Sequence, residues 1–513
     1  MSTRTPLYRA RQTDRAAGGK IESVTLHLVG VVLFAAGCGM LACGAVELLD
    51  GGTKSAALFG PGIGFAVGGG LLFRRTISPV RIPSATIYGA ILTAWAAFAI
   101  AAALPYMLSG VLDRFDLALF EAVSGFTTTA STVLRSPEAV SHGILLWRAT
   151  TQWFGGVAIT VFVVSVLPYV RSAGFEHLAG ISHSWGAERM ASRIQEMAKR
   201  IVLVYSGFTL VVAALYALFG MGTFDAVAHA FSTVSTGGFS THRESLAFFN
   251  SAGIEWTAIG AMILAGGNFA LYWQALRGRP LKLFRSVELR AYLIIVTLVA
   301  VAAVGWMTTS GAAADDVRRS IFGAVSIATT TGWRVVDYTQ WAGAVQLVLL
   351  FAMVVGGMPG GAAGGFKTFR LLAVVGHTRR HLFRQLHPRA VPLVRISGEV
   401  ISDTVISGIL GFFALFMGVG AVATLMVSAI GGHDLPTSIS LVASSLGNVG
   451  PPLGTFTHHA DLHAGVRDVL MVVMLAGRLE IYPVVLGLVP VFRFIGNLLP
   501  PKVALAVARL GRG

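Results

Sequence analysis

The sequence predicts an all-α membrane protein with four pseudo-symmetric helix–loop–helix repeats around a central pore, preceded by a two-helix hairpin. Three observations lead to this fold class. Of the 513 residues, 54% are hydrophobic and only 12% are charged, about half the charged share of a soluble domain. Long apolar stretches recur, each able to cross the roughly 30 Å core of a bilayer. Between them, four short apolar segments each end at a cluster of small polar residues.

Composition also limits the classes of function. The net charge of +15 is, in a membrane chain, typical of basic cytoplasmic loops, so we expect membrane lipid and no nucleic acid as a partner. The two cysteines, Cys38 and Cys43, both lie in the first apolar stretch and predict neither a disulfide framework nor a transition-metal site. No lysine of a phosphate-binding loop follows the glycine runs. We find no set of catalytic groups and expect no enzyme.

The amino-terminal region, residues 1–82, is predicted to hold a basic tail and a transmembrane hairpin with spans at 24–48 and 55–73. The second span ends at Arg74 and Arg75, and basic residues also precede the first span. Positive charge marks the cytoplasmic side of membrane proteins. Both ends of the hairpin are therefore expected in the cytoplasm, and no signal peptide is expected.

Each repeat is predicted to contain an outward span, a half-length helix, a polar turn and a return span. The repeats are expected at residues 83–172, 198–280, 286–385 and 398–495. The outward spans are predicted at 84–110, 201–220, 287–309 and 400–430. The half-length helices, too short to cross a bilayer, are predicted at 115–125, 224–234, 318–328 and 436–445. The return spans are predicted at 144–170, 252–276, 340–357 and 466–492.

The orientation of the repeats follows from their basic residues. Every return span runs into a basic segment, which predicts four parallel repeats, circular closure and a cytoplasmic carboxyl terminus. A secondary transporter with a binding site at the membrane midplane would have inverted repeats. It is kept as an alternative of a different class.

The turns after the half-length helices predict a cation selectivity filter. Irregular backbone at membrane depth is tolerated only where protein or water covers it, and carbonyls aimed at one axis can replace the hydration shell of a cation. Glycine allows the backbone angles that this needs. One such cluster is typical of ordinary helix packing, but four at matched positions favour a filter. The predicted filter residues are Thr128, Thr129, Ala130, Thr236, Gly237, Gly238, Thr330, Thr331, Gly332, Ser445, Leu446 and Gly447.

Two further features are expected below the filter. The glycine-rich run of residues 356–367 cannot continue a straight helix, so it breaks the third return span, either as a flexible link or as backbone that lines the pore. Arg478 has apolar residues on both sides, and a charge at a helix centre costs about 2.5–3.5 kcal/mol. We expect it to be a fixed positive charge that slows cations; an ion pair with Glu480 or another carboxylate is the alternative. Lys367 and Arg370 are expected near the cytoplasmic mouth, and Arg148 at the membrane edge or as a brace of the outer vestibule.

Several stretches resemble the TrkH-type subunit of bacterial potassium uptake systems, in the superfamily that includes the Ktr and plant HKT transporters. They are residues 124–134, 146–168, 232–242, 326–333, 356–370, 446–454 and 477–483. The resemblance spans all four repeats. It implies K⁺ as the substrate at the filter, a homodimer in the bacterial inner membrane and a cytoplasmic partner similar to the TrkA ring. Nucleotide would be bound only by that partner, and this chain would bind no cofactor.

The resemblance also assigns a gate to the residues below the filter. It identifies residues 356–367 as an intramembrane gate loop. The residues expected to act in gating are Gly356, Gly357, Gly360, Gly361, Gly364, Gly365, Lys367 and Arg478.

One residue departs from the pattern of the family, which usually has glycine where this chain has Ala130. At a positive φ angle an alanine costs about 1 kcal/mol, and its carbonyl is then expected to tilt. We hypothesise weaker discrimination between K⁺ and Na⁺. A channel or transporter for Na⁺ or mixed monovalent cations on the same scaffold is therefore the nearer alternative. Coupling to another ion is left open.

Overall fold

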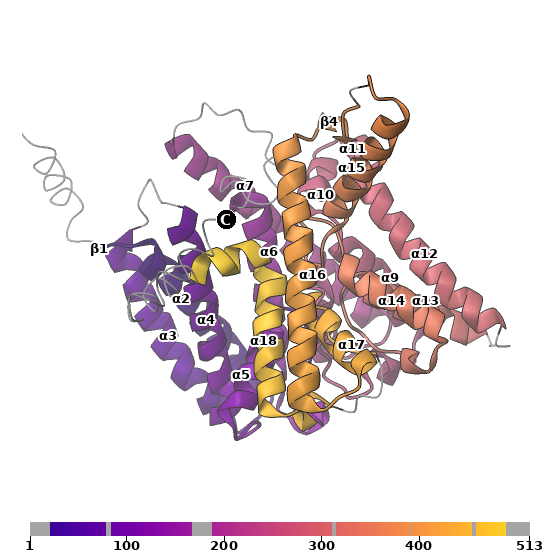
Figure 1. Ribbon diagram of the computed structural model, residues 1–513. Helices are drawn as coiled ribbons and strands as arrows, with labels where there is room; N and C mark the ends of the chain where they lie inside the picture. The colour runs from indigo at the N-terminus through magenta and orange to yellow at the C-terminus, as the bar shows by residue number, and fades with distance from the viewer. Residues whose placement is uncertain are drawn as a thin grey trace, which may run out of the picture.

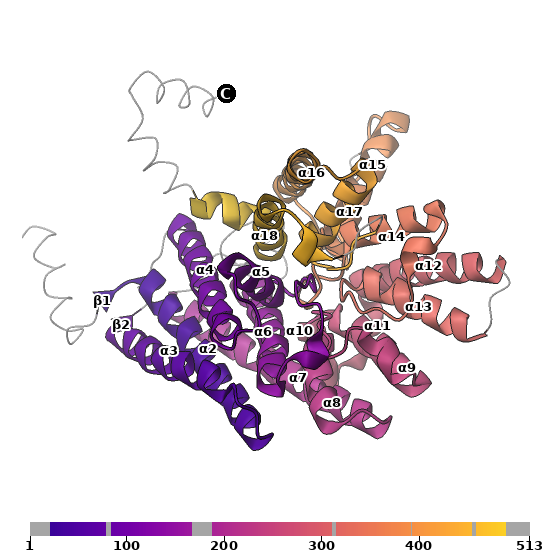
Figure 2. The ribbon, with the colours of Figure 1, turned by 90° about the horizontal axis from the view of Figure 1, so that it is seen from below.

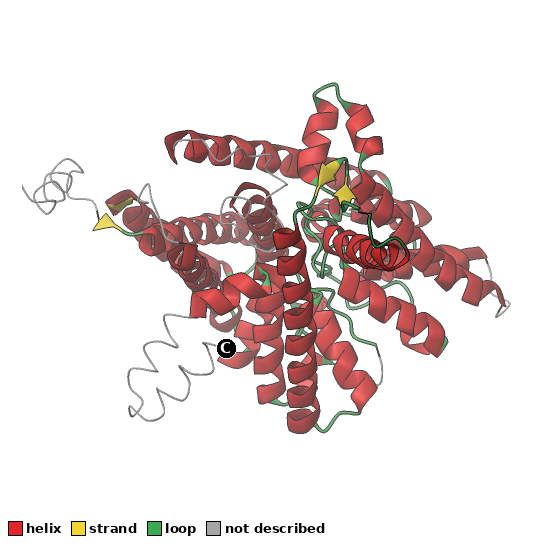
Figure 3. Ribbon diagram, turned by 45° about the horizontal axis from the view of Figure 1, so that its top comes forward, coloured by secondary structure: helices red, strands yellow, loops and turns green. Residues whose placement is uncertain are grey.

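The computed structural model of the protein describes residues 21–77, 84–166, 187–309, 314–390, 392–453 and 458–488. Most of these residues lie in helices, which are coloured along the chain in Figure 1 and by type of secondary structure in Figure 3. The described strands form two pairs of two residues each: β1 (Ile21–Glu22) pairs in parallel with β2 (Thr76–Ile77), and β3 (Arg395–Ile396) pairs antiparallel with β4 (Glu399–Val400).

The helices follow the predicted order of a hairpin and four repeats. The hairpin is α2 (Val24–Leu49) and α3 (Ser55–Arg75). Repeat one consists of α4 (Ser84–Leu108), α5 (Phe115–Phe126), η1 (Pro137–Ala139), α6 (His142–Val161) and the π-helical η2 (Phe162–Val166). Repeat two consists of α7 (Ala187–Leu218), α8 (Thr223–Val234), η5 (Ser245–Phe249), α9 (Ala252–Ala265), α10 (Phe269–Leu276) and α11 (Pro280–Arg285).

Repeats three and four follow the same plan. Repeat three consists of α12 (Val287–Thr309), α13 (Ala314–Ala328), η6 (Tyr338–Gln340), α14 (Gly343–Val355) and α15 (Thr368–Leu386). Repeat four consists of α16 (Asp403–Gly431), α17 (Leu435–Leu446), η7 (His459–Asp461), α18 (Ala464–Leu479) and the helix Ile481–Leu488.

The helices have the lengths that a membrane protein needs. In the described part of the chain six helices are long and apolar enough to cross a bilayer, or eight if each of two bent pairs counts as one span. The half-length helices α5, α8 and α17 each have 12 residues and α13 has 15, so none of them can span about 30 Å alone. The predicted class of multi-pass helical membrane protein is confirmed.

The four repeats surround a common centre. Figure 2 shows α5 and α6 followed in a circle by α8, then by α9 and α13, and then by α17 and α18. Partly buried ion pairs join neighbouring repeats: Glu255 of repeat two lies 2.6 Å from Arg318 of repeat three, and Arg467 of repeat four lies 2.6 Å from Asp116 of repeat one. The second pair closes the circle.

Two return spans differ from the expectation of continuous helices. The return span of repeat two bends by 98° between α9 and α10, and that of repeat four bends by 112° after α18. In repeat two the oxygen of Asn268 accepts hydrogen bonds from the amides of Ala270 and Leu271, which starts a new helix in a new direction. In repeat four Glu480 takes a φ of 70°, which no continuing helix can hold. The break expected in repeat three is present between α14 and α15.

The basic termini fall outside the described residues. The tail of residues 1–20 and the carboxyl-terminal residues 489–513 carry part of the charge on which the predicted orientation rests. The loop residues 167–186 also lie outside them. The predicted orientation of the termini stays a prediction.

Close helix packing in the hairpin depends on glycine. A Cβ atom added to Gly37 of α2 would overlap with the backbone of Ala66 in α3, and one added to Gly69 would lie 2.5 Å from the amide nitrogen of Phe34. Small residues let membrane helices approach this closely. The hairpin is also attached to repeat one, because the buried carboxylate of Glu47 accepts a 2.8 Å hydrogen bond from the amide of Gly143 at the start of α6.

We predict that Gly37→Val destabilises the hairpin, because the two helices must separate to hold the side chain. The expected loss is about 1–3 kcal/mol, as for other overpacked sites. Gly64→Val is the matched control, since an added Cβ at Gly64 meets no atom within 4 Å. Loss of the monomeric or dimeric peak in size-exclusion chromatography after heating in detergent measures the effect. Equal losses for both variants would contradict the packing argument.

Candidate functional site

The four half-length helices end in turns with the same backbone conformation. We call these turns the pore loops; they are residues 127–131, 235–239, 329–333 and 447–451. The second residue of each loop has a positive φ between 52° and 58°: Thr128, Thr236, Thr330 and Asn448. The fourth residue has a positive φ between 62° and 105°: Ala130, Gly238, Gly332 and Gly450. The four pore loops thus adopt the same backbone conformation although their sequences differ.

Backbone hydrogen bonds close each pore loop onto its helix in the same way. In the first loop the amide of Thr128 donates to the carbonyl of Gly125, and the amide of Thr129 donates to that of Ser124, both at 2.9 Å. The equivalent pairs in the other loops are Thr236–Thr233, Gly237–Ser232, Thr330–Ile327, Thr331–Ser326, Asn448–Ser445 and Val449–Ser444. The loops therefore satisfy much of their own backbone at membrane depth, as irregular backbone there must.

The register predicted for the fourth loop is three residues early. Ser445 and Leu446 still belong to α17, and Gly447 follows them with a φ of −78°. Gly447 thus corresponds to Thr127, and the turn consists of the next three residues, Asn448 to Gly450. The search for a glycine directly after small hydroxyl residues led to the wrong position. The correct turn could have been located from Asn448, because asparagine tolerates positive φ. Gly450, which precedes Pro451, follows it two residues later.

The glycines of the pore loops pack against the carbonyl groups of the next repeat. A Cβ atom added to Gly238 would overlap with the carbonyl oxygen of Thr331, one added to Gly332 with that of Val449, and one added to Gly450 with that of Thr129. Repeat two thus meets three, three meets four, and four meets one. The pore loops form a closed ring with backbone carbonyls at its contacts.

Ala130 places a methyl group inside this ring. Its Cβ lies 2.9, 3.1 and 2.5 Å from the ideal Cβ positions of Gly238, Gly332 and Gly450. A single side-chain carbon thus faces all three other loops, and Ala130 keeps the positive φ, 62°, at which alanine is strained. Ala130, the residue expected from the sequence to perturb the filter, therefore lies at the centre of the ring.

A cavity of about 520 Å³ opens onto the ring. It is lined by Ala130, Gly238 and Gly332 and, from the connections after the loops, by Arg135, Arg243, Arg334, His242, His458 and Asp461. Arg334 also lines a second cavity together with Asp337. The pKa of Asp337 lies below its ordinary value, and the largest cause is a hydrogen bond from the hydroxyl of Thr339 to its carboxylate. Asp337 therefore stays negative beside this basic wall at neutral pH.

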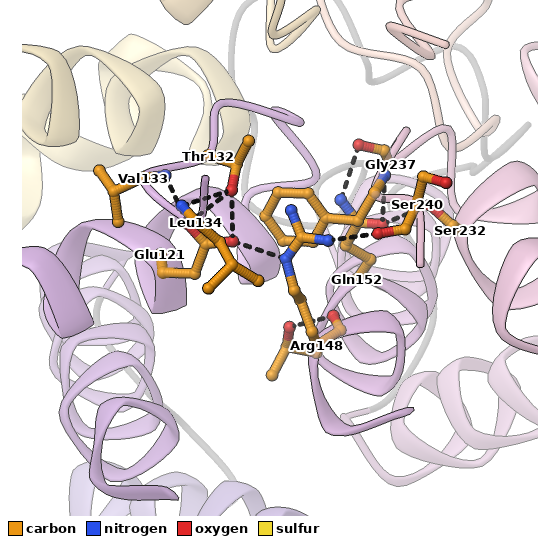
Figure 4. Close-up of polar contacts among 11 residues, drawn as sticks. Glu121, Thr132, Val133, Leu134, Arg148, Gln152, Ser232, Gly237 and Ser240 are labelled. Carbon is orange, nitrogen blue, oxygen red and sulfur yellow. Dashed lines mark hydrogen bonds and ion pairs between the residues drawn. The ribbon is translucent and has the colours of Figure 1, made fainter. Parts of the chain in front are cut away.

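A buried ion pair braces the first two pore loops (Figure 4). The carboxylate of Glu121 accepts hydrogen bonds from Arg148 at 2.6 Å and from the amide of Val133 at 2.8 Å. The guanidinium of Arg148 also donates to the carbonyl of Ser240 at 2.8 Å and lies over the ring of Phe239. Of the two positions expected for Arg148, the structure shows the brace, because its side chain is buried rather than exposed at the membrane edge.

Gln152 holds the second pore loop from α6. Its amide nitrogen donates to the carbonyl of Gly237 at 2.6 Å, and its oxygen accepts from the hydroxyl of Ser232 and the amide of Phe239. The carbonyl of Gly237 thus has a protein donor. In the fourth loop the side chain of Asn448 donates to the hydroxyl of Thr129 and to the carbonyl of Met474, both at 3.0 Å.

The break in repeat three lies directly against the pore loops. The amide of Gly364 donates to the hydroxyl of Thr330 at 2.8 Å, and a Cβ added to Gly364 would overlap with the carbonyl of Gly447. The segment also meets the break in repeat two, because the amides of Met358 and Ala362 donate to the carbonyls of Gly266 and Ala265. Gly356, Gly360, Gly365 and Lys367 of this segment all have positive φ.

Three basic side chains are buried around this segment. Lys367 donates to the carbonyl of Ala363 at 3.0 Å, and Arg478 donates to that of Ala362 at 2.6 Å. Glu480, the alternative ion-pair partner considered for Arg478, pairs with Arg370 at 2.6 Å. Lys367 and Arg370 are 4% and 1% exposed, so neither is an exposed residue of a mouth. Arg478 lies in the last turn of α18, and no carboxylate within the described ranges forms an ion pair with it.

The helical membrane fold and the ring of backbone carbonyls are typical of a membrane cation transport protein. The TrkH family model, described as "Cation transport protein", matches residues 58–491. The chain belongs to this family.

Individual relatives agree with the family assignment. The chain is 35% identical over 449 residues to the Trk system potassium uptake protein TrkH of Halomonas elongata, covering 84% of this chain and 91% of that protein. It is 32% identical over 409 residues to the protein of the same name from Escherichia coli, covering 78% and 84%. The crystal structure of the potassium transporter TrkH from Vibrio parahaemolyticus superposes with a TM-score of 0.83 at 29% identity, covering 91% of this chain and 99% of that one.

We predict that Arg148→Ala destabilises the protein by about 3–5 kcal/mol, because it leaves the carboxylate of Glu121 buried and unpaired. Arg135→Ala is the control. Arg135 pairs with Asp461 on the surface, where the two side chains are 60% and 45% exposed, and such pairs contribute at most about 1 kcal/mol. Thermal unfolding in detergent measures both variants. A similar melting temperature for the two would contradict the role of Arg148 as a brace.

Proposed function

We propose that this chain is the transmembrane subunit of a bacterial potassium uptake system and conducts K⁺ inward through the ring of pore loops. The observation that carries the proposal is the repeated turn in which each glycine packs against a carbonyl of the next repeat. Such carbonyls can replace the water around a dehydrated cation. The relatives named as potassium uptake proteins support K⁺ as that cation.

The proposed filter consists of three residues from each loop. In loops one to three they are the predicted residues Thr128 to Ala130, Thr236 to Gly238 and Thr330 to Gly332. In loop four they are Asn448, Val449 and Gly450. The carboxyl ends of the four half-length helices point their partial negative charge toward this ring, which favours a cation over an anion.

The segment of residues 356–367 is proposed as the gate. It is hydrogen-bonded both to Thr330 above it and to the break between α9 and α10 beside it, so a shift of the inner helices would reach the ring through it. Arg478 binds the carbonyl of Ala362 in this segment. Its buried charge opposes passage of a cation through Coulomb repulsion.

The subunit is proposed to work in an assembly. The relatives are named as proteins of a Trk system, which supports further subunits. We propose a homodimer in the inner membrane with both termini in the cytoplasm, where a TrkA-like ring binds the regulatory nucleotide. No cofactor is proposed for this chain, and its role is transport rather than enzymatic catalysis.

Conduction of Na⁺ or of mixed monovalent cations is the second candidate, and Ala130 favours it. The methyl group of Ala130 lies among the three glycines of the ring. A ring that is perturbed on one side discriminates less between a K⁺ ion and a smaller Na⁺ ion.

Uptake of rubidium-86 into liposomes that contain the purified chain tests the function and the role of Ala130. We expect K⁺ to block uptake more strongly than Na⁺. Ala130→Gly should widen this difference, because it gives the first loop the residue that the second, third and fourth loops carry at this position and removes the methyl group from the ring. Equal block of rubidium uptake by K⁺ and Na⁺ in the wild-type chain would favour the second candidate function, conduction of mixed monovalent cations. An unchanged ratio in Ala130→Gly would reject the role of the methyl group.

We predict that Arg478→Ala raises rubidium uptake at least roughly tenfold. A unit charge roughly 8 Å from a passing cation, at an effective dielectric constant of about 20, opposes it by about 2 kcal/mol. Arg478→Lys keeps the charge and is expected to keep the low flux. The melting temperature in detergent shows whether each variant is folded. Folded Arg478→Ala with wild-type uptake would exclude the charge as a barrier.

A further inference from the structure

The second repeat ends in an arm that leaves the direction of its return helix. We call residues 269–285, which form α10 and α11, the arm. It begins after the 98° bend that follows α9. Because α9 is an apolar helix of a membrane-spanning bundle, a helix at this angle to it runs close to the plane of the bilayer. Figure 1 shows α10 and α11 near the end of the molecule where α15 and β4 also lie.

The arm exposes apolar and basic side chains in alternation. Leu276, Leu281 and Phe284 are 75%, 65% and 71% exposed. Four basic residues lie among them and no acidic residue occurs within the arm: the basic residues are Arg277, Arg279, Lys282 and Arg285.

The surroundings of the arm add further positive charge. The guanidinium groups of Arg277 and of Arg200 in α7 lie 4.9 and 5.8 Å from the ring of Trp273. The nearby carboxylate of Glu196 is already paired with Arg200 at 2.9 Å, and Glu288, at the start of α12, is buried. The exposed surface of the arm is therefore strongly basic.

This pattern fits one environment, the boundary between lipid tails and headgroups. Exposed leucine and phenylalanine side chains are unfavourable in water, and arginine and lysine are unfavourable in hydrocarbon. Segments that carry both kinds of side chain lie in the interface, with the apolar groups toward the tails and the charges among the headgroups. Clusters of basic residues next to membrane-spanning helices attract anionic lipids.

The base of the arm is bonded to the interrupted segment of repeat three. The amide of Phe269, the first residue of α10, donates to the carbonyl of Gly360 at 3.1 Å. The side chain of Phe269 is fully buried and packs against the rings of Tyr205 and Tyr272. A displacement of the arm would therefore be transmitted to residues 356–367.

We propose that the arm is a binding site for anionic phospholipid headgroups and that bound lipid controls ion flux by fixing the position of α10 against residues 356–367. The binding site stands on the exposed side chains of the arm alone. The effect on flux rests on the proposed function, in which residues 356–367 form the gate.

Binding is tested with radiolabelled phosphatidylglycerol and the full chain in detergent, with phosphatidylcholine as the neutral comparison. The triple variant Arg279→Gln/Lys282→Gln/Arg285→Gln removes three exposed charges and leaves Arg277 on Trp273. Each charge near an anionic surface contributes roughly a fivefold factor in affinity, so a loss of at least about tenfold is expected. Arg279→Lys/Arg285→Lys keeps the charge and is the matched control, for which near wild-type affinity is expected.

The result of the binding experiment decides the site. Wild-type affinity in the triple variant, or equal retention of both lipids by the wild-type chain, would overturn it. The second of these outcomes would assign the basic surface to a soluble partner instead. Phe284→Ser tests the apolar contribution separately and is expected to weaken retention without changing the charge.

Flux is tested with rubidium-86 uptake in vesicles of phosphatidylcholine with and without phosphatidylglycerol. The wild-type chain is expected to change its uptake severalfold with the anionic lipid, and the triple variant to be insensitive to it. If the triple variant loses lipid binding but its uptake still responds to phosphatidylglycerol, the coupling to flux is overturned, while the binding site itself is retained. No uptake by any variant in any vesicle would overturn the proposed function, while the binding result would still stand.

Discussion

The architecture depends on one steric constraint, the contact between a glycine of the second, third and fourth pore loops and a carbonyl of the next repeat. At Gly238, Gly332 and Gly450 there is no room for a Cβ atom, because a carbonyl oxygen of the neighbouring repeat occupies that space. The loops can close into a ring only when this contact forms. The ion pairs between repeats two and three and between repeats four and one help to hold the repeats at the separation that the ring needs.

A ring of backbone inside a membrane also needs polar support, and the chain supplies it from buried side chains. Glu121 and Arg148 connect the first and second loops, Gln152 fixes the carbonyl of Gly237, and Asn448 connects the fourth loop to the first. Buried polar groups are costly unless they are paired. These contacts pair them, and they differ between the first, second and fourth loops, so the pseudo-symmetry of the backbone is not fully matched by symmetry of its supports.

Much of this arrangement could be predicted from sequence, because hydropathy and the recurrence of small polar clusters report directly on helices and turns. The hairpin, the four repeats, the break in repeat three and three of the four loop positions follow from those patterns. The fourth loop was displaced because its turn uses Asn448 and a later glycine, Gly450. The bends after α9 and α18 were missed because the segments on both sides of each bend are apolar, and hydropathy does not report direction. The pairing of Glu480 with Arg370 depends on contacts between repeats, which no local pattern contains.

The breaks in the return helices divide these spans into outer and inner halves. Within the described residues, the return helix of the first repeat continues from α6 into η2 as far as Val166, whereas the other three are interrupted after Ala265, Val355 and Leu479. The outer halves can therefore stay rigid around the ring while the inner halves pivot at these joints. Under the proposed function, one continuous return helix and three interrupted ones would make the inner mouth widen on the side away from repeat one, rather than evenly around the axis.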